Sequence, residues 1–325
     1  MRRMTPQASL WPSYLDLTDC PYFWPYCSQP LYATGFPVVV NVTIINSMGV
    51  YGRVVDTPVY HPYVNRNGLW LDVGVTFSRD LWPWTGHLAL HLAVRDAPDA
   101  AFFDGIAEGY VSLKVESIES STKTTLSTEL KLPIRVKIAP TPKRQRRILI
   151  DYFHNIRYPS AYVPGDDLTK ISGPLDWLGD HIHTNLRGLY QPLRQLGYFV
   201  EVLQKPLTCF NASNYGTLMI IDPEDEFAPN EIKKVHTDVH KRGLSLVVFA
   251  GWFNASVQEA LKFYDANTKR LWVPITGGSN IPALNDLLSP FAIKFADNIV
   301  GGSFKVGDFY GMCFNILQSS SNSLH

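Results

Sequence analysis

Residues 174–203 read PLDWLGDHIHTNLRGLYQPLRQLGYFVEVL. This stretch begins as a polar loop, takes on helical periodicity over residues 183–196, and ends in an apolar run over residues 199–203. The apolar face of the predicted helix consists of Leu186, Leu189, Tyr190, Leu193 and Leu196. Pro192 interrupts this helix and should cost about 3 kcal/mol or introduce a kink. An amphipathic helix that leads into an apolar strand is typical of α/β folds.

The same alternation of strands and helices continues around this stretch. Apolar strands are predicted over residues 148–152, 217–222 and 244–250. A helix predicted over residues 230–242 ends at Gly243, because glycine favours the left-handed conformation that closes a helix. Strands that are apolar along their whole length are typical of parallel sheets covered on both faces. We therefore predict a parallel-sheet α/β domain over residues 148–310.

Residues 36–139 carry a different pattern, with strands only. Five segments of strand character cover residues 36–45, 69–77, 86–94, 110–115 and 130–138. Alternation would place Leu69, Leu71, Val73, Val75 and Phe77 on one face of their strand. The polar residues 118–127 are predicted to form a hairpin loop. Together these features predict an antiparallel β-sandwich.

Three connecting segments complete the predicted organisation. Residues 1–35 are rich in cysteine and aromatic residues, and residues 311–325 form a divergent tail that ends in Ser and Asn. Residues 140–147, PTPKRQRR, form a linker with two prolines and a basic cluster. Because this linker has no apolar side chain to bury, we expect its basic cluster to be exposed.

The composition argues against several classes of protein. The 325 residues contain 29 Lys plus Arg and 29 Asp plus Glu, so the formal net charge is zero. A neutral chain lacks the basic surface that nucleic acid or anionic lipid requires. The sequence has no run of about 18 apolar residues and predicts no membrane-spanning helix. The first residues, MRRMTPQASL, lack the apolar core of a signal peptide.

Long motifs along most of the chain resemble a known family. They include DLTDCPYFWPYCSQPLY at residues 16–32, LWPWTGHLAL at residues 81–90 and TGGSNIPALNDLL at residues 276–288, and residues 174–203 belong to the same set. In this order, the motifs resemble the region that follows the catalytic domain in the membrane-bound transcription factor site-1 proteases. That family belongs to the subtilisin-like serine endopeptidases, or subtilases.

The resemblance implies a function for the full-length protein. Such a protein would be a Golgi serine endopeptidase that cleaves membrane-bound transcription-factor precursors in sterol regulation and the stress response. This chain would then be a non-catalytic fragment or truncated form in the lumen of the endoplasmic reticulum or Golgi. Its expected partners are the protease domain and luminal proteins or the precursors, with no nucleic acid and no cofactor. The alternative is a free-standing binding protein of the secretory pathway without enzymatic activity.

The sequence lacks the catalytic residues of a subtilase. The local signatures D-[ST]-G, H-G-T and G-T-S-M-A do not occur in it. The α/β domain resembles a degenerate glutamine-amidotransferase-like fold, in which a nucleophile would follow a central strand. In the segment FAGWF, residues 249–253, Trp252 stands where a cysteine would be needed. We therefore predict no catalytic residue and expect the chain alone not to hydrolyse peptides.

Several residues are candidates for covalent modification. Cys20 and Cys27 lie seven residues apart in a Pro-rich loop, and the oxidising compartment implied by the resemblance favours a disulfide over metal binding. The sequons N-V-T, N-A-S and N-A-S make Asn41, Asn211 and Asn254 candidate N-glycosylation sites. A furin-like processing site would use Arg144, Arg146 and Arg147, although an ordinary solvated linker explains the same residues.

Two polar clusters were weighed as cation sites. The first consists of His154, Asp176, Asp180, His181 and His183. Because alternate residues of an extended segment point to opposite faces, capping and loop hydrogen bonds explain these residues better, and no metal site is predicted. The second cluster, DPEDE at residues 222–226, follows a strand and is interpreted as a solvated acidic loop.

Overall fold

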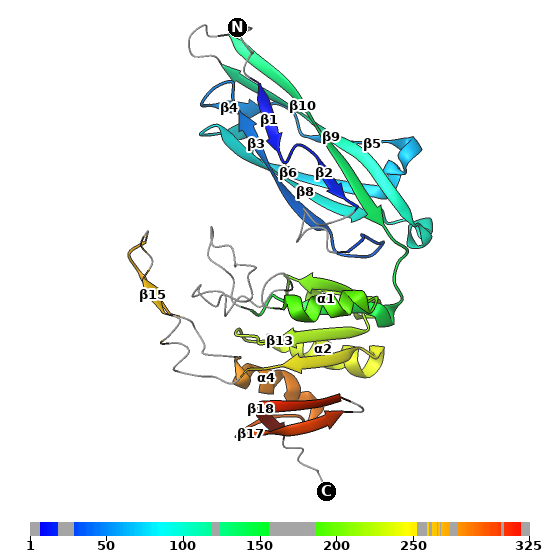
Figure 1. Cartoon of the computed structure of the whole chain (residues 1–325), viewed down its shortest axis with the longest axis vertical. Helices are drawn as coiled ribbons and strands as arrows, with labels where there is room; N and C mark the ends of the chain where they lie inside the picture. The colour runs from blue at the N-terminus through cyan, green and yellow to red at the C-terminus, as the bar shows by residue number, and fades with distance from the viewer. Residues whose placement is uncertain are drawn as a thin grey trace. The chain divides into compact units, whose positions relative to one another are not determined.

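The computed structural model describes residues 7–18, 29–118, 124–155, 182, 186–251, 259, 262–264, 266, 268–273, 279–306 and 309–319. The chain divides into two compact units, Met1–Pro142 and Lys143–His325. Figure 1 shows that strands coloured blue to green build the first unit, whereas α-helices and strands together build the second.

The first unit contains two β-sheets. One sheet has the strand order β1 (Ala8–Trp11), β3 (Val38–Asn46), β8 (Thr85–Val94), β6 (Leu71–Phe77). The other has the order β2 (Leu15–Leu17), β10 (Thr125–Ile138), β9 (Gly105–Ile118), β4 (Gly52–Val54), β7 (Asp80–Leu81), and β5 (Val59–Pro62) also pairs with β9. These pairs are antiparallel, apart from β2 and β10, which run parallel.

One hydrophobic core is shared by the two sheets of the first unit. Its members include alternate residues of β3 and β8, namely Val40, Val42, Ile44, Leu88, Leu90 and Leu92. Alternate residues of β9 and β10 enter the same core, among them Val111, Val115, Ile134 and Val136. Alternation buries one face of each strand because successive side chains point to opposite sides. The predicted β-sandwich is confirmed.

Two details of the sequence prediction for this unit were wrong. Leu69 lies in the 3₁₀ turn Gly68–Trp70 and is exposed, because Asn67, with φ of 59°, turns the chain before β6 begins. The loop predicted over residues 118–127 is shorter, since β9 reaches Ile118 and β10 starts opposite it at Thr125. Backbone hydrogen bonds join the two strands in this part of the ladder, so polar residues form strands here without an alternating apolar pattern. Residues 119–123 lie outside the described residues.

A parallel sheet forms the centre of the second unit. Its strand order is β12 (Phe199–Leu203), β11 (Arg147–Asp151), β13 (Thr217–Ile221), β14 (Ser245–Phe249). The α-helices described in this unit include α1 (Arg187–Gln195), α2 (Pro229–Arg242) and α4 (Ile281–Leu288). Two hairpin-like pairs follow, β15 (Phe263–Tyr264) with β16 (Leu271–Trp272) and β17 (Phe295–Val306) with β18 (Phe309–Ser319). The predicted α/β domain is confirmed, and Gly243 closes α2 with φ of 62°.

Helix α1 packs on one face of this sheet through its leucines and Tyr190, against a cluster that contains Ile148 of β11. Leu196, which was predicted on that apolar face, is instead exposed. The helix ends before it, and Gly197 turns the chain with φ of 80°. Pro192 remains inside the helix, where its carbonyl accepts the Leu196 amide at 2.9 Å.

The basic cluster is exposed only in part, which differs from the prediction: Lys143 and Arg146 are exposed, Arg144 is half-buried and Arg147 is buried. Arg144 Nε donates to the Tyr215 carbonyl at 2.7 Å, and Arg146 Nη1 donates to another backbone carbonyl of the second unit at 2.9 Å. Arg147 begins β11, is buried, and pairs with Glu201 at 3.2 Å. Guanidinium groups therefore anchor this segment through hydrogen bonds, without the apolar side chains that the prediction required.

Part of the segment that was predicted to be a divergent tail, residues 311–325, forms a strand. Residues 309–319 form β18, which pairs antiparallel with β17, and Cys313 lies opposite Gly302 in this ladder. The segment GMCFNILQS contains enough β-forming apolar residues to continue a strand.

Replacing Arg147 tests the contribution of its buried ion pair. We expect Arg147→Ala to lower the free energy of unfolding of the second unit by about 3–5 kcal/mol, because Glu201 would keep a buried, uncompensated charge. Urea denaturation measures this change. The control is Arg242→Ala, whose guanidinium is 47% exposed and pairs with Asp238 at 3.5 Å. Its loss should cost below about 1 kcal/mol. Equal effects of the two substitutions would contradict the assignment.

Candidate functional site

The carboxyl edge of the parallel sheet is the place to look for a site in the second unit. Strand β11 lies between β12 and β13. The chain first passes from β11 to its neighbour β12 on one side, and then crosses to β13 on the other side of β11. In open α/β sheets, ligands bind beside such a switch point, at the carboxyl ends of the strands. Asp151 ends β11, and Asp222 directly follows β13.

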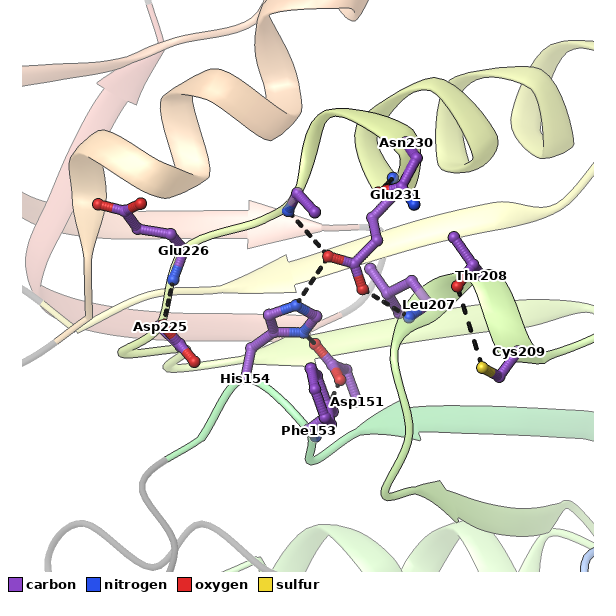
Figure 2. Close-up of polar contacts among 11 residues, drawn as sticks. Asp151, Phe153, His154, Leu207, Thr208, Cys209, Asp225, Glu226, Asn230 and Glu231 are labelled. Atoms are coloured by element: carbon purple, nitrogen blue, oxygen red, sulfur yellow. Dashed lines mark hydrogen bonds and ion pairs between the residues drawn. The ribbon is translucent and has the colours of Figure 1, made fainter.

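A buried cluster of charged side chains occupies this edge. His154 lies between two carboxylates, with Nδ1 2.7 Å from Asp151 Oδ2 and Nε2 3.4 Å from Glu231 Oε2. All three side chains are at most 4% exposed. The ring of Phe227 packs 4.3 Å from the imidazole, centroid to centroid. Figure 2 shows the imidazole between the two acids, with both of its nitrogens engaged.

Glu231 also holds the loops around it. Its Oε2 accepts the Ala228 amide at 2.8 Å, and its Oε1 accepts the Leu207 amide at 2.8 Å (Figure 2). Glu231 occupies the third position of α2, and Pro229 occupies the first, where a missing amide costs nothing. A carboxylate at this position satisfies amides that a helix leaves unpaired at its start.

The two acids control the charge of His154. Burial disfavours the imidazolium, but the hydrogen bonds and negative charges of Asp151 and Glu231 outweigh burial and raise the pKa of His154 above its usual value. A protonated imidazole that donates from both nitrogens has no lone pair with which to accept a proton. When the imidazole is protonated, both of its nitrogens donate to carboxylates, and we call the Asp151–His154–Glu231 cluster the ionic clamp.

Figure 2 also draws the thiol of Cys209, in the segment that follows β12. Cys209 is exposed, and its Sγ lies 3.9 Å from Thr208 Oγ1. A thiol nucleophile needs a base within hydrogen-bond reach. His154 is engaged by carboxylates on both nitrogens and does not provide that base.

A second polar contact closes the segment after β14, where a nucleophile would be expected. The amide of Gly251 donates to Asp222 Oδ1 and, at 3.0 Å, to Ser279 Oγ. Ser279 in turn donates its hydroxyl to Asp222 Oδ1 at 2.5 Å. Asp222 thus holds this turn from its position in the acidic loop, with φ of 44°. Trp252 lies outside the described residues.

The candidate residues from the sequence fall at separate places. Asn41 is exposed on β3, and Asn211 is exposed with its side-chain oxygen accepting the Ser213 amide at 3.1 Å. The remaining candidates lie outside the described residues: Asn254, Cys20, Cys27, Asp176, Asp180, His181 and His183. His154 is described, and its ring contacts Asp151 and Glu231.

Sequence reasoning missed Asp151 and Glu231. Two signals were available: Asp151 ends a strand that was predicted, and Glu231 follows Pro229 at the start of a predicted helix. Their pairing through His154 spans 77 residues from His154 to Glu231, and no local pattern records it.

The described residues contain neither a metal cluster nor a membrane-spanning helix. Within them, no group of three or more His, Cys, Asp or Glu side chains is placed to hold a metal ion. In the same part of the chain, the helices are too short or too polar to cross a bilayer.

Comparison with known proteins gives the family. Residues 11–141 match the family model described as MBTPS1, third Ig-like domain, and residues 142–315 match MBTPS1, fourth GATase-like domain. The chain belongs to the membrane-bound transcription factor site-1 protease family. The second match ends at residue 315 and so includes the first residues of the segment 311–325.

Relatives in animals and plants match nearly the whole chain. Site-1 protease of Homo sapiens is 53% identical over 306 residues, which cover 93% of this chain. The same protein of Cricetulus griseus is 52% identical over 306 residues, 93% of this chain, and subtilisin-like protease SBT6.1 of Arabidopsis thaliana is 47% identical over the same length and share. In each case the chain spans 29% of the relative's length.

The ionic clamp makes the stability of the second unit depend on pH. Because the pKa of His154 is raised in the folded state, the stabilisation is complete below the unfolded value of about 6.5 and is lost as the pH rises through the folded pKa. We expect the stability difference between the natural chain and His154→Gln to be largest in acid and to shrink at higher pH. Urea denaturation between pH 5 and 9 measures it.

The control for this experiment is His240→Gln, at an exposed position of α2. That substitution should leave the pH dependence unchanged. A difference between His154→Gln and the natural chain that stays constant over the whole pH range would contradict the clamp.

Proposed function

We propose that this chain is the non-catalytic Ig-like and GATase-like region of a site-1-protease-like serine endopeptidase. In full length, that enzyme would cleave membrane-bound transcription-factor precursors in sterol regulation and the stress response. The chain is then a fragment or truncated form that lies in the lumen of the endoplasmic reticulum or Golgi. It supports the protease domain and binds luminal partners.

The observation that carries this proposal is the ionic clamp at the carboxyl edge of the sheet. An α/β enzyme would hold its substrate there. In this chain, His154 and two carboxylates lie at that edge and hydrogen-bond to one another. A site whose side chains are buried and hydrogen-bonded to one another supports a scaffold role better than a catalytic one.

The proposed compartment is compatible with the described candidate sites. Asn41 and Asn211 are exposed, as acceptors of N-linked glycans must be. A Cys20–Cys27 disulfide would form in the same oxidising lumen and remains part of the proposal.

Peptidase activity tests the non-catalytic assignment. We expect the purified chain to show no hydrolysis of peptides with basic residues, because its sequence contains no subtilase triad motif. A fluorogenic peptide assay measures this, with full-length human site-1 protease as the positive control. Hydrolysis that a serine-directed inhibitor abolishes would contradict the proposal.

The transcript that encodes this chain separates the two functional interpretations. An in-frame subtilase domain upstream of residue 1 supports the protease assignment. A separate secretory signal with no protease domain would overturn it in favour of a free-standing binding protein.

A further inference from the structure

Four exposed apolar side chains gather at one end of the β-sandwich: Val50, Tyr51, Trp82 and Trp84, here called the aromatic patch. Trp82 is 66% exposed and Trp84 is 55% exposed. The four residues are neighbours in the fold. Gly52, which follows Tyr51, pairs with Leu81, which precedes Trp82. The Trp84 amide donates to the Val50 carbonyl at 3.0 Å. Contiguous exposed apolar residues of this size mark interaction surfaces.

The patch is held in one arrangement by its own hydrogen bonds. The Trp84 carbonyl accepts the Asn46 amide at 2.6 Å, and the Tyr51 hydroxyl donates to Asp80 Oδ1 at 2.6 Å. Both ends of the Trp84 backbone are therefore fixed. A surface that is ordered before binding loses little conformational entropy when a partner covers it.

The charges around the patch favour a protein partner over a membrane. Arg53, Arg79 and Asp80 lie at its rim and are exposed, so both signs of charge are present. Attraction to an anionic lipid surface requires a cluster of basic residues. An aromatic centre with a polar rim of mixed charge is the composition of a protein–protein interface.

The strand register places the patch where the chain enters the first unit. Ala8, at the start of β1, pairs with Asn46, whose amide bonds to Trp84. The chain leaves the unit from Ile138, which pairs with Gly105 at the other end of the β9–β10 ladder. A domain that precedes this region in the full-length protein would therefore be attached beside the patch.

We propose that the aromatic patch docks against the part of the full-length protease that precedes this region. This inference rests on the proposed function. The family models that match are named the third and fourth domains, and the chain spans 29% of the human relative, so the relatives supply such a partner. The two tryptophans are the anchors of the interface, because large aromatic side chains dominate binding energy.

Hydroxyl-radical footprinting of tryptophan tests the docking. The isolated chain is compared with full-length human site-1 protease in which this chain replaces the matched 306 residues. We expect oxidation of Trp82 and Trp84 to slow by about fivefold or more in the full-length protein, as in a covered interface core. Phe102 is the control: it is 84% exposed near the exit end of the unit and should be oxidised equally in both proteins.

A variant separates docking from general folding. Trp84→Asn keeps the turn, because asparagine tolerates the φ of 59° at this position. In the full-length protein, this substitution should restore the oxidation of Trp82 towards its rate in the isolated chain, while the circular dichroism spectrum stays unchanged.

Each remaining outcome overturns a defined statement. A full-length protein without peptidase activity overturns the proposed function. Normal activity with unprotected tryptophans overturns only the docking. If Trp82 and Trp84 are protected from oxidation only when phosphatidylserine vesicles are present, the patch binds a membrane surface and the docking proposal is wrong. If their protection rises with the concentration of the isolated chain, the patch binds a second copy of the chain and the docking proposal is wrong.

Discussion

Strand β11 buries a charged side chain at each of its ends, and this constraint governs the second unit. Arg147 begins the strand and Asp151 ends it, with three apolar residues between them. An unpaired buried ion costs several kcal/mol, so each end dictates a partner. Glu201 of β12 meets Arg147, and His154 meets Asp151. The neighbours of this central strand are thereby specified by charge as well as by apolar packing.

The clamp at the carboxyl end then connects loops that follow three different strands. His154 follows β11, Leu207 follows β12, and Ala228 follows β13. All three contact the carboxylate of Glu231. One side chain on the first turn of α2 thus joins these loops at the edge where an α/β enzyme would leave room for a substrate. The same atoms that stabilise the fold account for the proposed absence of catalysis there.

The first unit depends on a different kind of interaction, and this difference decides how much the sequence could predict. Its core follows strict alternation in β3 and β8, a local pattern that is visible in the sequence. Parallel strands such as β12 were predicted equally well from their apolar runs. Leu69 and Leu196 were misplaced because a turn at Asn67 and a helix end before Gly197 interrupt patterns that continue in the sequence. Backbone conformation, not hydrophobicity, decided both positions.

Local sequence patterns could not predict the buried charged contacts of the second unit. Arg147 was assigned to a solvated linker because it follows other basic residues, and its burial depends on Glu201, 54 residues away. The resemblance to the site-1 proteases predicted the family, and the strand and helix patterns predicted the order of the two folds. Neither predicted which side chains hold the sheet edge together. Only the register of the parallel strands brings these residues to one place.

Native-state hydrogen exchange after removal of Glu231 tests this account most directly. We expect Glu231→Ala to accelerate exchange of the Leu207 and Ala228 amides together, because both lose their acceptor. The exchange rate of the Leu244 amide, which donates to the Asp238 carbonyl at 3.1 Å, should stay unchanged. The control substitution Glu226→Ala should change the exchange of none of these amides. If the Leu207 and Ala228 amides exchange at the rates of the natural chain, Glu231 does not hold these loops and the ionic clamp is not the constraint described.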